Sequence, residues 1–183
     1  AGNLDSMLNK FTAAKKIRST DSYSPGGKAG LRPDRATIVY ANRIRECWPD
    51  IPVIIGGIEA SLRRFAHYDY WSDSVRRSIL VDSRADLLIH GMGERQIVSI
   101  AEKLNQGLSI REIHDVNGTC WLTGDRGEVP ANSLEVASYE QVSANKTDYA
   151  EAFKTQYLEQ DPIRGRPIVQ LHGERFLVQN IPA

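Results

Sequence analysis

Two short apolar runs stand out in the pattern of hydrophobic and polar positions along the chain. Residues 52–55 read Pro-Val-Ile-Ile and end at the double glycine Gly56-Gly57, and residues 87–90 read Leu-Leu-Ile-His and end at Gly91. Short, continuous apolar runs bounded by turn residues are typical of strands buried on both faces of a sheet. We therefore predict two buried strands, one in each run.

The first half of the chain also contains two segments with helical periodicity. The first segment begins at an N-cap for which Asp5, Ser6 and Asn3 are candidates, and the second has Pro33 at its first position. The apolar positions expected to face a core are Leu8, Phe11, Ala13 and Ala14 in the first segment, and Ala36, Val39, Tyr40, Ile44 and Cys47 in the second.

Two more helices are predicted further along the chain. One covers residues 94–106 and ends at Gly107, and the other covers residues 147–158 with Thr147 as its cap. Their apolar faces consist of Ile97, Ile100, Ala101 and Leu104 in the former, and Ala150, Phe153 and Tyr157 in the latter.

The order helix, buried strand, loop, buried strand, helix predicts an α/β fold in which parallel strands are joined by right-handed crossovers. Only two strongly buried strands are visible, whereas an average sheet has about five or six. We therefore expect an incomplete, Rossmann-like parallel sheet with flanking helices, whose first strands lie upstream of Ala1.

The C-terminal part has a different pattern. Alternating residues around turn signals predict hairpins at residues 119–129 and 168–178, and the polar residues 130–146 between them predict a linker. We divide the chain into an α/β domain at residues 1–130 and an extension of linker, helix and hairpin at residues 131–183.

Composition narrows the range of partners. The chain has 23 basic and 23 acidic residues, so its net charge does not favour a nucleic acid or a membrane surface. Neither a transmembrane stretch nor a signal peptide is recognisable, which predicts a cytoplasmic protein. Cys47 and Cys120 form neither a C-x-x-C pair nor a disulfide framework, as expected in a reducing compartment.

The ends of the two predicted strands carry the first candidate site. Gly56-Gly57 follows one strand, and Gly91, Gly93 and Glu94 follow the other. If the strands are neighbours, both corners open on one rim, where ligands of α/β sheets bind, and the helix that starts at Glu94 offers free N–H groups to an anion. The glycine spacing is not a dinucleotide fingerprint. A tight turn without any ligand is the alternative explanation of the double glycine.

The second candidate is the polar and aromatic segment at residues 63–77. Arginines among aromatic rings can bind phosphate, nucleic acid or a carboxylate ligand. An ion-paired loop that joins two parts of the protein, with Tyr70 and Trp71 as apolar anchors, is an equal alternative.

The histidines and cysteines predict no catalytic chemistry. His67 has no second ligand at helical spacing, so we predict a structural hydrogen bond for it, and the other three histidines receive no role. Cys47 and Cys120 are predicted to be small buried hydrophobes. Neither a Ser-His-Asp arrangement nor a phosphate-binding P-loop can be identified.

Several stretches resemble the N-terminal region of the YgiQ-type radical SAM proteins, an uncharacterised bacterial family. The resemblance spans nearly the whole chain. The stretches that carry it are A-G-N-L-D-S-M from Ala1, K-A-G-L-R-P-D-R-A-T from Lys28, I-G-G-I-E-A-S-L-R-R from Ile55, A-H-Y-D-Y-W-S-D-S-V-R-R-S-I-L-V-D-S from Ala66 and H-G-E-R-F-L-V-Q-N-I-P-A from His172.

This resemblance implies a cytoplasmic enzyme that uses a [4Fe–4S] cluster and S-adenosylmethionine. The C-x-x-x-C-x-x-C loop that binds such a cluster lies beyond Ala183 in the family, and Cys47 and Cys120 cannot replace it. The chain alone is therefore expected to bind no metal and to be inactive. The layout is more distantly similar to the cobalamin-binding-like Rossmann domains of radical SAM enzymes. The D-x-H-x-x-G motif of true cobalamin binders would precede Ala1, which leaves cobalamin undetermined.

We therefore expect an accessory domain that faces a small-molecule ligand or the radical SAM core of the same polypeptide. The residues predicted to face that ligand or interface are Gly56, Gly57, Glu59, Ser61, Arg63, Arg64, His67, Tyr68, Asp69, Trp71, Asp73, Arg76, Arg77, Gly91 and Glu94. Two rival interpretations remain at this point: a self-sufficient nucleotide- or phosphate-binding module, and a domain that contacts RNA through the arginine-aromatic segment.

Overall fold

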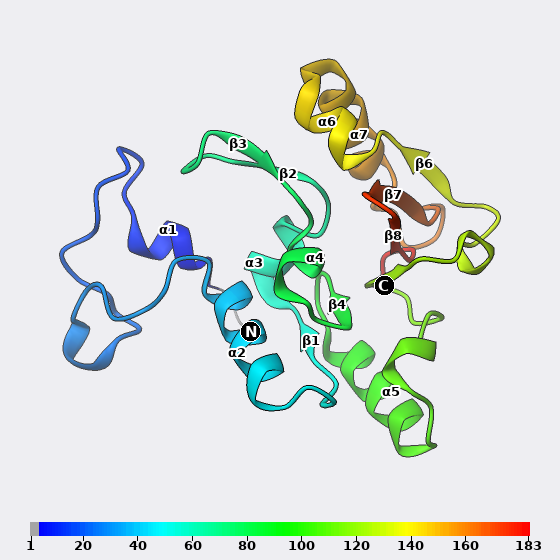
Figure 1. The fold of residues 1–183 in the computed structure, drawn as a ribbon, viewed down its shortest axis with the longest axis horizontal. Helices are drawn as coiled ribbons and strands as arrows, with labels where there is room; N and C mark the ends of the chain where they lie inside the picture. The colour runs from blue at the N-terminus through cyan, green and yellow to red at the C-terminus, as the bar shows by residue number, and fades with distance from the viewer. Residues whose placement is uncertain (1–3) are drawn as a thin grey trace.

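The two apolar runs of the sequence form adjacent strands, and the rest of the fold is arranged around them (Figure 1). The computed structural model describes residues 4–183. The strands are β1 (Ile54–Ile55), β2 (His67–Asp69), β3 (Ser74–Arg76), β4 (Leu87–Ile89), β5 (Thr119–Thr123), β6 (Leu134–Val136), β7 (Ile168–His172) and β8 (Arg175–Gln179). The α-helices are α1 (Ser6–Lys10), α2 (Ala36–Cys47), α3 (Gly57–Leu62), α4 (Ile79–Ser83), α5 (Glu94–Asn105), α6 (Tyr139–Ala144) and α7 (Lys146–Leu158). Short 3-10 helices are η1 (Pro25–Gly27), η2 (Ile110–Glu112) and η3 (Arg126–Glu128).

Six strands form one sheet in the order β1-β4-β5-β8-β7-β6, and β2 and β3 form a separate hairpin. β1 and β4 pair in parallel, with Ile54 opposite Leu87, as the sequence predicts. The α/β class is confirmed. The sheet as a whole is mixed, because β6 and β7 are also parallel whereas the three central pairings are antiparallel.

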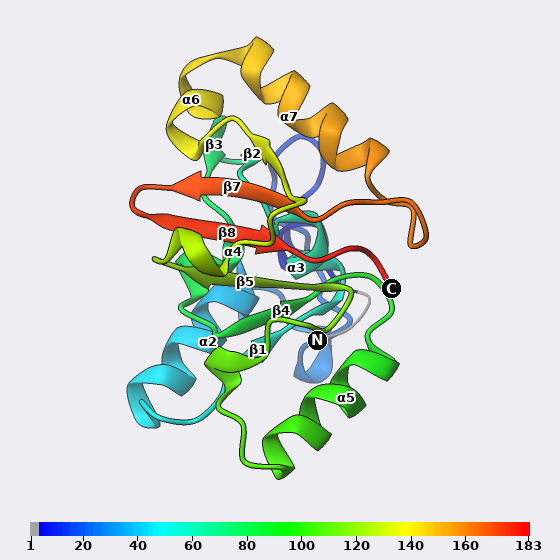
Figure 2. The ribbon, with the colours of Figure 1, turned by 90° about the vertical axis from the view of Figure 1, so that its right-hand side faces the viewer.

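Helices cover both faces of this sheet (Figures 1 and 2). On one face, Ala41 of α2, Ala60 of α3 and Leu80 of α4 belong to a buried cluster with Leu88 and Cys120 of the sheet. On the other face, Ile100 of α5 joins a cluster with Leu87, Trp121 and Val178. Adjacent strand residues such as Leu87 and Leu88 point to opposite faces, so apolar residues at consecutive positions are what a sheet covered on both sides requires.

The segment after residue 118 differs from the sequence prediction. The hairpin predicted at residues 119–129 does not form: β5 instead pairs with β4 and β8, and η3 follows it. The predicted linker contains β6 and α6. The hairpin of β7 and β8 is confirmed, with Gly173 at φ +63° in its turn. Because β8 lies beside β5, the sheet continues across residue 130.

The helices begin close to the predicted positions, but several apolar faces are wrong. Asp5 is the N-cap of α1, since its carboxylate accepts hydrogen bonds from the backbone N–H groups of Met7 and Leu8; Asn3 lies outside the described residues. Met7 is buried, whereas Leu8 of the predicted face is 57% exposed. α2 begins at Ala36 rather than at Pro33.

In α2 and α7 several of the large apolar side chains predicted to face the core are exposed instead, although Ile38 of α2 and Tyr149 of α7 do pack against it. The residues that α2 buries are Ala36 and Ala41, and those of the predicted stripe that are exposed are Tyr40, Ile44 and Cys47. In α7, Asn145 rather than Thr147 is the cap, and Ala152 is buried whereas Phe153 and Tyr157 are exposed. α5 buries Ile100 as predicted but leaves Ile97 46% exposed. The fully buried residues of α2 and α7 are all alanines, which let a helix pack closely on the core.

Candidate functional site

The rim predicted at the strand ends is present. The carboxyl ends of β1 and β4 and the start of α5 surround a cavity of about 450 Å³. Its lining residues are Ile54, Ile55, Gly56, Gly57, Ile89, Gly91, Met92, Gly93, Glu94 and Ile97. The structure therefore brings together four of the predicted site residues, Gly56, Gly57, Gly91 and Glu94. We call this region the strand-end rim.

The glycines of the rim allow close packing within the chain. A Cβ at Gly56 would lie 3.3 Å from the carbonyl oxygen of Ile89, and one at Gly93 would lie 2.8 Å from Cγ2 of the same residue. Gly57 and Gly91 adopt positive φ, at +83° and +76°, which other residues rarely do. These observations favour the tight-turn explanation of the double glycine.

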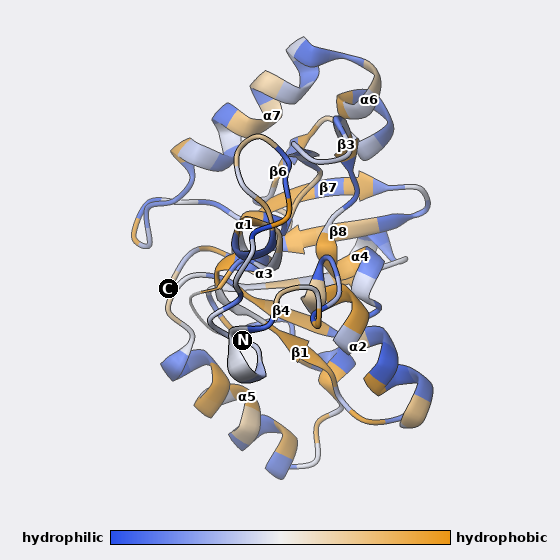
Figure 3. Ribbon diagram, turned by 90° about the vertical axis from the view of Figure 1, so that its left-hand side faces the viewer, coloured by the Kyte–Doolittle hydropathy of each residue, from blue (hydrophilic) through white to orange (hydrophobic). Residues whose placement is uncertain are grey.

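The walls of the rim are mostly apolar. Ile54, Ile89 and Ile97 line the cavity, and Met92 at its edge is 84% exposed. Figure 3 colours β1 and β4 as hydrophobic, with further hydrophobic turns on α5. Glu94 is the one charged lining residue, and it occupies the first turn of α5, where a carboxylate competes with an anion for the free N–H groups. The arrangement suits an apolar contact better than a phosphate.

Glu59 does not face the rim. It is 4% exposed, and its carboxylate accepts hydrogen bonds from the backbone N–H groups of Ser6 at 2.9 Å and Thr37 at 3.3 Å. It therefore joins α3 to the first two helices, which corrects its predicted placement. Ser61 is half-buried, and its hydroxyl oxygen accepts a hydrogen bond from the backbone N–H of Gly91 at 3.2 Å. Ser61 therefore holds the backbone of a residue that lines the rim.

Several members of the arginine-aromatic segment are buried in ion pairs rather than exposed. Arg63 pairs with Asp5, and Asp69 pairs with Arg35; Arg63 is 9% exposed and Asp69 2%. A residue buried in this way cannot belong to an exposed contact surface, which corrects the prediction for both. Arg76 and Arg77 both pair with Asp82, at 3.1 and 2.8 Å. The alternative of an ion-paired structural loop is thus supported.

The remaining candidates of the segment lie in two places. Arg64 bonds to the last strand: its Nε donates a hydrogen bond to Oε1 of Gln179 at 2.5 Å, and burial lowers the pKa of its guanidinium. Tyr68 and Asp73 lie on the β2–β3 hairpin and are joined by a 2.6 Å hydrogen bond from the Tyr68 hydroxyl. Both line a second cavity, of about 870 Å³, that the hairpin shares with α6 and α7. Trp71 packs against Tyr70, with ring centroids 5.7 Å apart.

His67 has the predicted structural role. Its Nδ1 lies 3.1 Å from the carbonyl oxygen of Phe65, and burial lowers its pKa to about 4. Cys120 is buried as predicted, and burial raises the pKa of its thiol to about 12. Cys47 is exposed, which corrects the prediction of a buried position. No three His, Cys, Asp or Glu side chains within residues 4–183 gather closely enough to hold a metal ion.

A group of buried polar residues near the rim escaped the sequence analysis. His90, Gln96 and Gln179 are each less than 10% exposed, and each has a side-chain nitrogen or oxygen without a hydrogen-bond partner among the described residues. Burial, together with the positive charge of Arg64, lowers the pKa of His90 to about 3. Polar residues that directly follow apolar runs, as His90 and Gln179 do, were the signal available in the sequence.

The end of the chain lies beside this group. A Cβ at Gly118 would lie 3.1 Å from Cβ of Ala183 and 3.2 Å from Nε2 of Gln96, on the first turns of α5. Figure 2 likewise places the C-terminus near the start of α5. The last residue is therefore at the same end of the sheet as the strand-end rim. Within residues 4–183, no helix combines the length and the apolar character needed to cross a membrane.

Comparison with known proteins identifies the class. The family model described as Radical SAM N-terminal matches residues 1–183. The chain belongs to the radical SAM N-terminal family, as its sequence motifs predict.

Its relatives are longer proteins. A UPF0313 protein of Clostridium botulinum (strain ATCC 19397 / Type A) is 59% identical over 182 residues, which cover 100% of this chain and 28% of the relative. A UPF0313 protein of Clostridium perfringens (strain ATCC 13124) is 54% identical over 181 residues, which cover 99% of this chain and 27% of the relative. The chain thus spans little more than a quarter of the length of these relatives. No solved structure matches it.

Proposed function

We propose that this chain is the N-terminal accessory domain of a longer, cytoplasmic radical SAM protein, and that its strand-end rim packs against the remaining polypeptide. The relatives support a longer protein, since the match covers 28% of the Clostridium botulinum protein. The observation that carries the proposed packing is the position of Ala183 beside Gly118 and Gln96. Residues that follow Ala183 would start at the same end of the sheet as the rim.

The surface chemistry of the rim supports the same proposal. An exposed methionine such as Met92 adapts its shape to a partner, and Ile97 adds exposed apolar area beside it. Burial of these two side chains against the following polypeptide would remove their apolar surface from water, which stabilises the docked arrangement.

The cofactors of the family would belong to the remaining polypeptide. A radical SAM protein binds a [4Fe–4S] cluster and S-adenosylmethionine, which supply the radical chemistry when bound. Closely spaced thiolates are needed to hold such a cluster. Cys47 is exposed on α2 and Cys120 is buried in β5, so the two do not fit this requirement. The role proposed for this chain is therefore to pack on the catalytic part and not to bind the iron.

The test compares the full-length protein with the chain of residues 1–183 by hydrogen exchange. We expect the backbone N–H groups of residues 91–97 to exchange more slowly in the full-length protein, because docking shields them. Met92→Asp is expected to remove that protection while leaving the thermal unfolding of the shorter chain unchanged, since Met92 is 84% exposed. Ile163→Asp is the matched control, because Ile163 is 89% exposed and does not line the rim.

Equal exchange of residues 91–97 in both proteins would contradict docking at the rim. Two other results would favour different interpretations. Stoichiometric binding of a [4Fe–4S] cluster by residues 1–183 would place the cofactor in this chain. Tight binding of a nucleotide or cobalamin by the same chain, weakened by changes at Gly91 or Glu94, would favour a ligand-binding module.

A further inference from the structure

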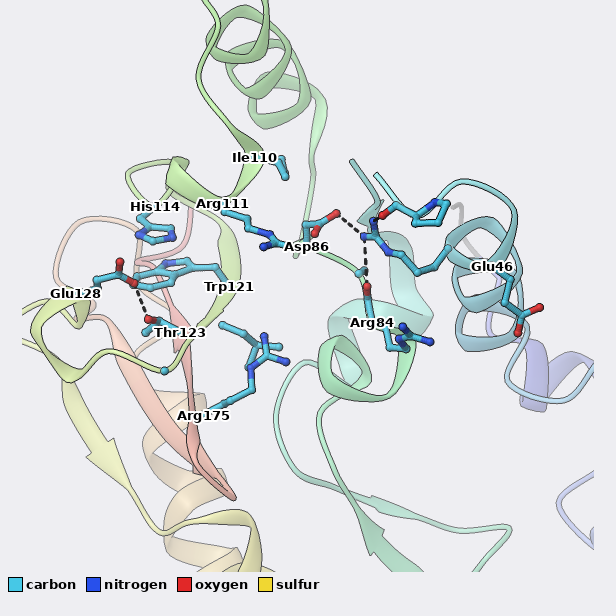
Figure 4. Close-up of a pocket in the computed structure, with 15 residues that line it drawn as sticks. Glu46, Arg84, Asp86, Ile110, Arg111, His114, Trp121, Thr123, Glu128 and Arg175 are labelled. Atoms are coloured by element: carbon cyan, nitrogen blue, oxygen red, sulfur yellow. Dashed lines mark hydrogen bonds and ion pairs between the residues drawn. The ribbon is translucent and has the colours of Figure 1, made fainter. Parts of the chain in front are cut away.

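A groove of about 870 Å³ lies at the opposite end of the sheet from the strand-end rim (Figure 4). It is bounded by the segments that lead into β1, β4 and β8 and by the end of β5. Its lining residues are Arg45, Glu46, Pro49, Arg84, Ala85, Asp86, Ile110, Arg111, His114, Trp121, Leu122, Thr123, Gly124, Glu128 and Arg175. We call it the arginine groove.

Four arginines line this groove, and three of them have no protein partner. Arg84, Arg111 and Arg175 make neither an ion pair nor a side-chain hydrogen bond with any residue of the described part of the chain. They come from three separate segments: the end of α4, η2 and the first residue of β8. In Figure 4, Arg111 and Arg175 lie on one side of the groove and Arg84 lies on the other.

The acidic residues of the groove are mostly neutralised by other groups. Asp86 forms a 2.6 Å ion pair with the fourth arginine, Arg45, and also accepts the backbone N–H of Val53 at 2.8 Å. Glu46 pairs with Arg43 at 2.5 Å, outside the groove. The unpaired charges that line the groove are therefore three guanidinium groups and one carboxylate, that of Glu128. The groove has a surplus of positive charge, although the whole chain is neutral.

Arg84 occupies a position where glycine would be expected. It is the C-cap of α4 and adopts φ +55°, a left-handed conformation that favours glycine or asparagine. Its carbonyl oxygen lies 3.4 Å from Nη2 of Arg45, so the backbone is anchored while the side chain remains free. Arg84 is thus an exposed lining residue of the groove, and its side chain has no hydrogen-bond or ion-pair partner among the described residues.

We propose that the arginine groove binds a small anionic ligand that carries two or more phosphate groups, such as an organic diphosphate. Guanidinium groups bind phosphate oxygens in a bidentate manner, and three of them can engage more than one phosphate. A cavity of about 870 Å³ is larger than a single phosphate needs and lies within the size range of small-molecule sites.

The aromatic residues of the groove argue against single-stranded RNA as the ligand. Trp121 is 2% exposed, and His114 is stacked on it with a 3.7 Å centroid distance. Exposed aromatic platforms on which successive bases stack are the usual means of binding single strands, and this groove does not provide a row of them. This proposal does not depend on the docking proposed for the rim, because the two regions share no lining residue.

The test is calorimetric titration of the full-length protein with pyrophosphate, ADP and a single-stranded RNA oligomer. We expect pyrophosphate and ADP to bind with a stoichiometry of one. Arg111→Gln and Arg175→Gln should each weaken binding roughly tenfold, and the triple variant with Arg84→Gln should abolish it. Thermal unfolding should be unchanged in the single variants, because these side chains make no contacts to lose. Arg164→Gln is the matched control, an exposed arginine that does not line the groove.

Three results would overturn the proposal. The first is no binding of pyrophosphate or ADP. The second is binding that the triple variant retains or that Arg164→Gln weakens equally, which indicates non-specific attraction. The third is binding of RNA through these arginines without binding of either phosphate compound. Each of these outcomes leaves the hydrogen-exchange test of the rim unaffected, so failures of the two proposals are distinguishable.

Discussion

Three histidines of this protein are held in their neutral form by the fold. Burial lowers the pKa of His90 to about 3 and the pKa values of His67 and His172 to about 4. An unfolded histidine has a pKa near 6.5, so the unfolded chain takes up protons at a higher pH than the folded chain does. The contribution of these residues to stability is therefore complete above pH 6.5 and is lost as the pH falls toward 4.

We predict that the free energy of unfolding falls between pH 6.5 and 4.5 with a slope of up to about 1.4 kcal/mol per pH unit for each buried histidine. His172→Gln is expected to reduce that slope by the contribution of one histidine, up to about 1.4 kcal/mol per pH unit. Urea unfolding at several pH values measures it. An identical slope in the variant would contradict the neutral, buried state of His172.

The two cysteines are expected to differ in reactivity. Cys120 is buried and its pKa is raised to about 12, whereas Cys47 is exposed on α2. The thiolate is the reactive form, so we predict that iodoacetamide modifies one thiol in the native protein at neutral pH and both in urea. Mass spectrometry of the labelled peptides measures this. Cys47→Ser should leave the native protein unlabelled, and labelling of Cys120 before unfolding would contradict the structure.

At the scale of elements, the junction between β4 and α5 depends on close packing. A Cβ at Gly93 would lie 2.8 Å from Cγ2 of Ile89. Ile89 lies in a strand, and its β-branched side chain has few rotamers into which it could move. We predict that Gly93→Ala destabilises the protein by roughly 1–3 kcal/mol, measured by urea unfolding. Gly124→Ala is the control, since no atom lies within 4 Å of its added Cβ. Equal stabilities of the two variants would contradict the packing described at the rim.

The elements that the sequence predicts well are those whose partners are close in the chain. The β7–β8 hairpin needs only the turn around Gly173, and α5 begins directly after β4, so local signals are sufficient for both. β5 is different. Its partner β8 lies more than 50 residues away, with Cys120 opposite Gln179, and nothing local distinguishes that pairing from a hairpin with the residues that follow. The prediction of a hairpin at residues 119–129 was wrong for this reason.

At the scale of the whole molecule, the two halves of the chain are joined across residue 130. Besides the β5–β8 ladder, the side-chain oxygen of Gln170 accepts the backbone N–H of Ala66 at 2.9 Å, and Gln179 accepts from Arg64 at 2.5 Å. The division at residue 130 stays a prediction, and these contacts favour a single cooperative unit.

We therefore predict that a chain of residues 1–130 does not unfold cooperatively by itself. Without β8, the edge of β5 would be left with unpaired backbone groups and exposed apolar side chains. Circular dichroism during heating, and the dispersion of amide NMR signals, measure the outcome against residues 1–183. A cooperative transition in residues 1–130 would support an independent domain.

The amino-acid sequence by itself determined the α/β class, the two buried strands and the family, because apolar runs, glycines at strand ends and contiguous motifs are local features. It also identified Gly56, Gly57, Gly91 and Glu94 as residues of one rim, since neighbouring parallel strands end at the same edge of a sheet. Only the tertiary structure decided which polar residues are free. Arg63 and Arg84 look alike in the sequence, but one is buried against Asp5 and the other has no partner among the described residues. Pairing between distant charges depends on how the chain packs, and no local pattern encodes it.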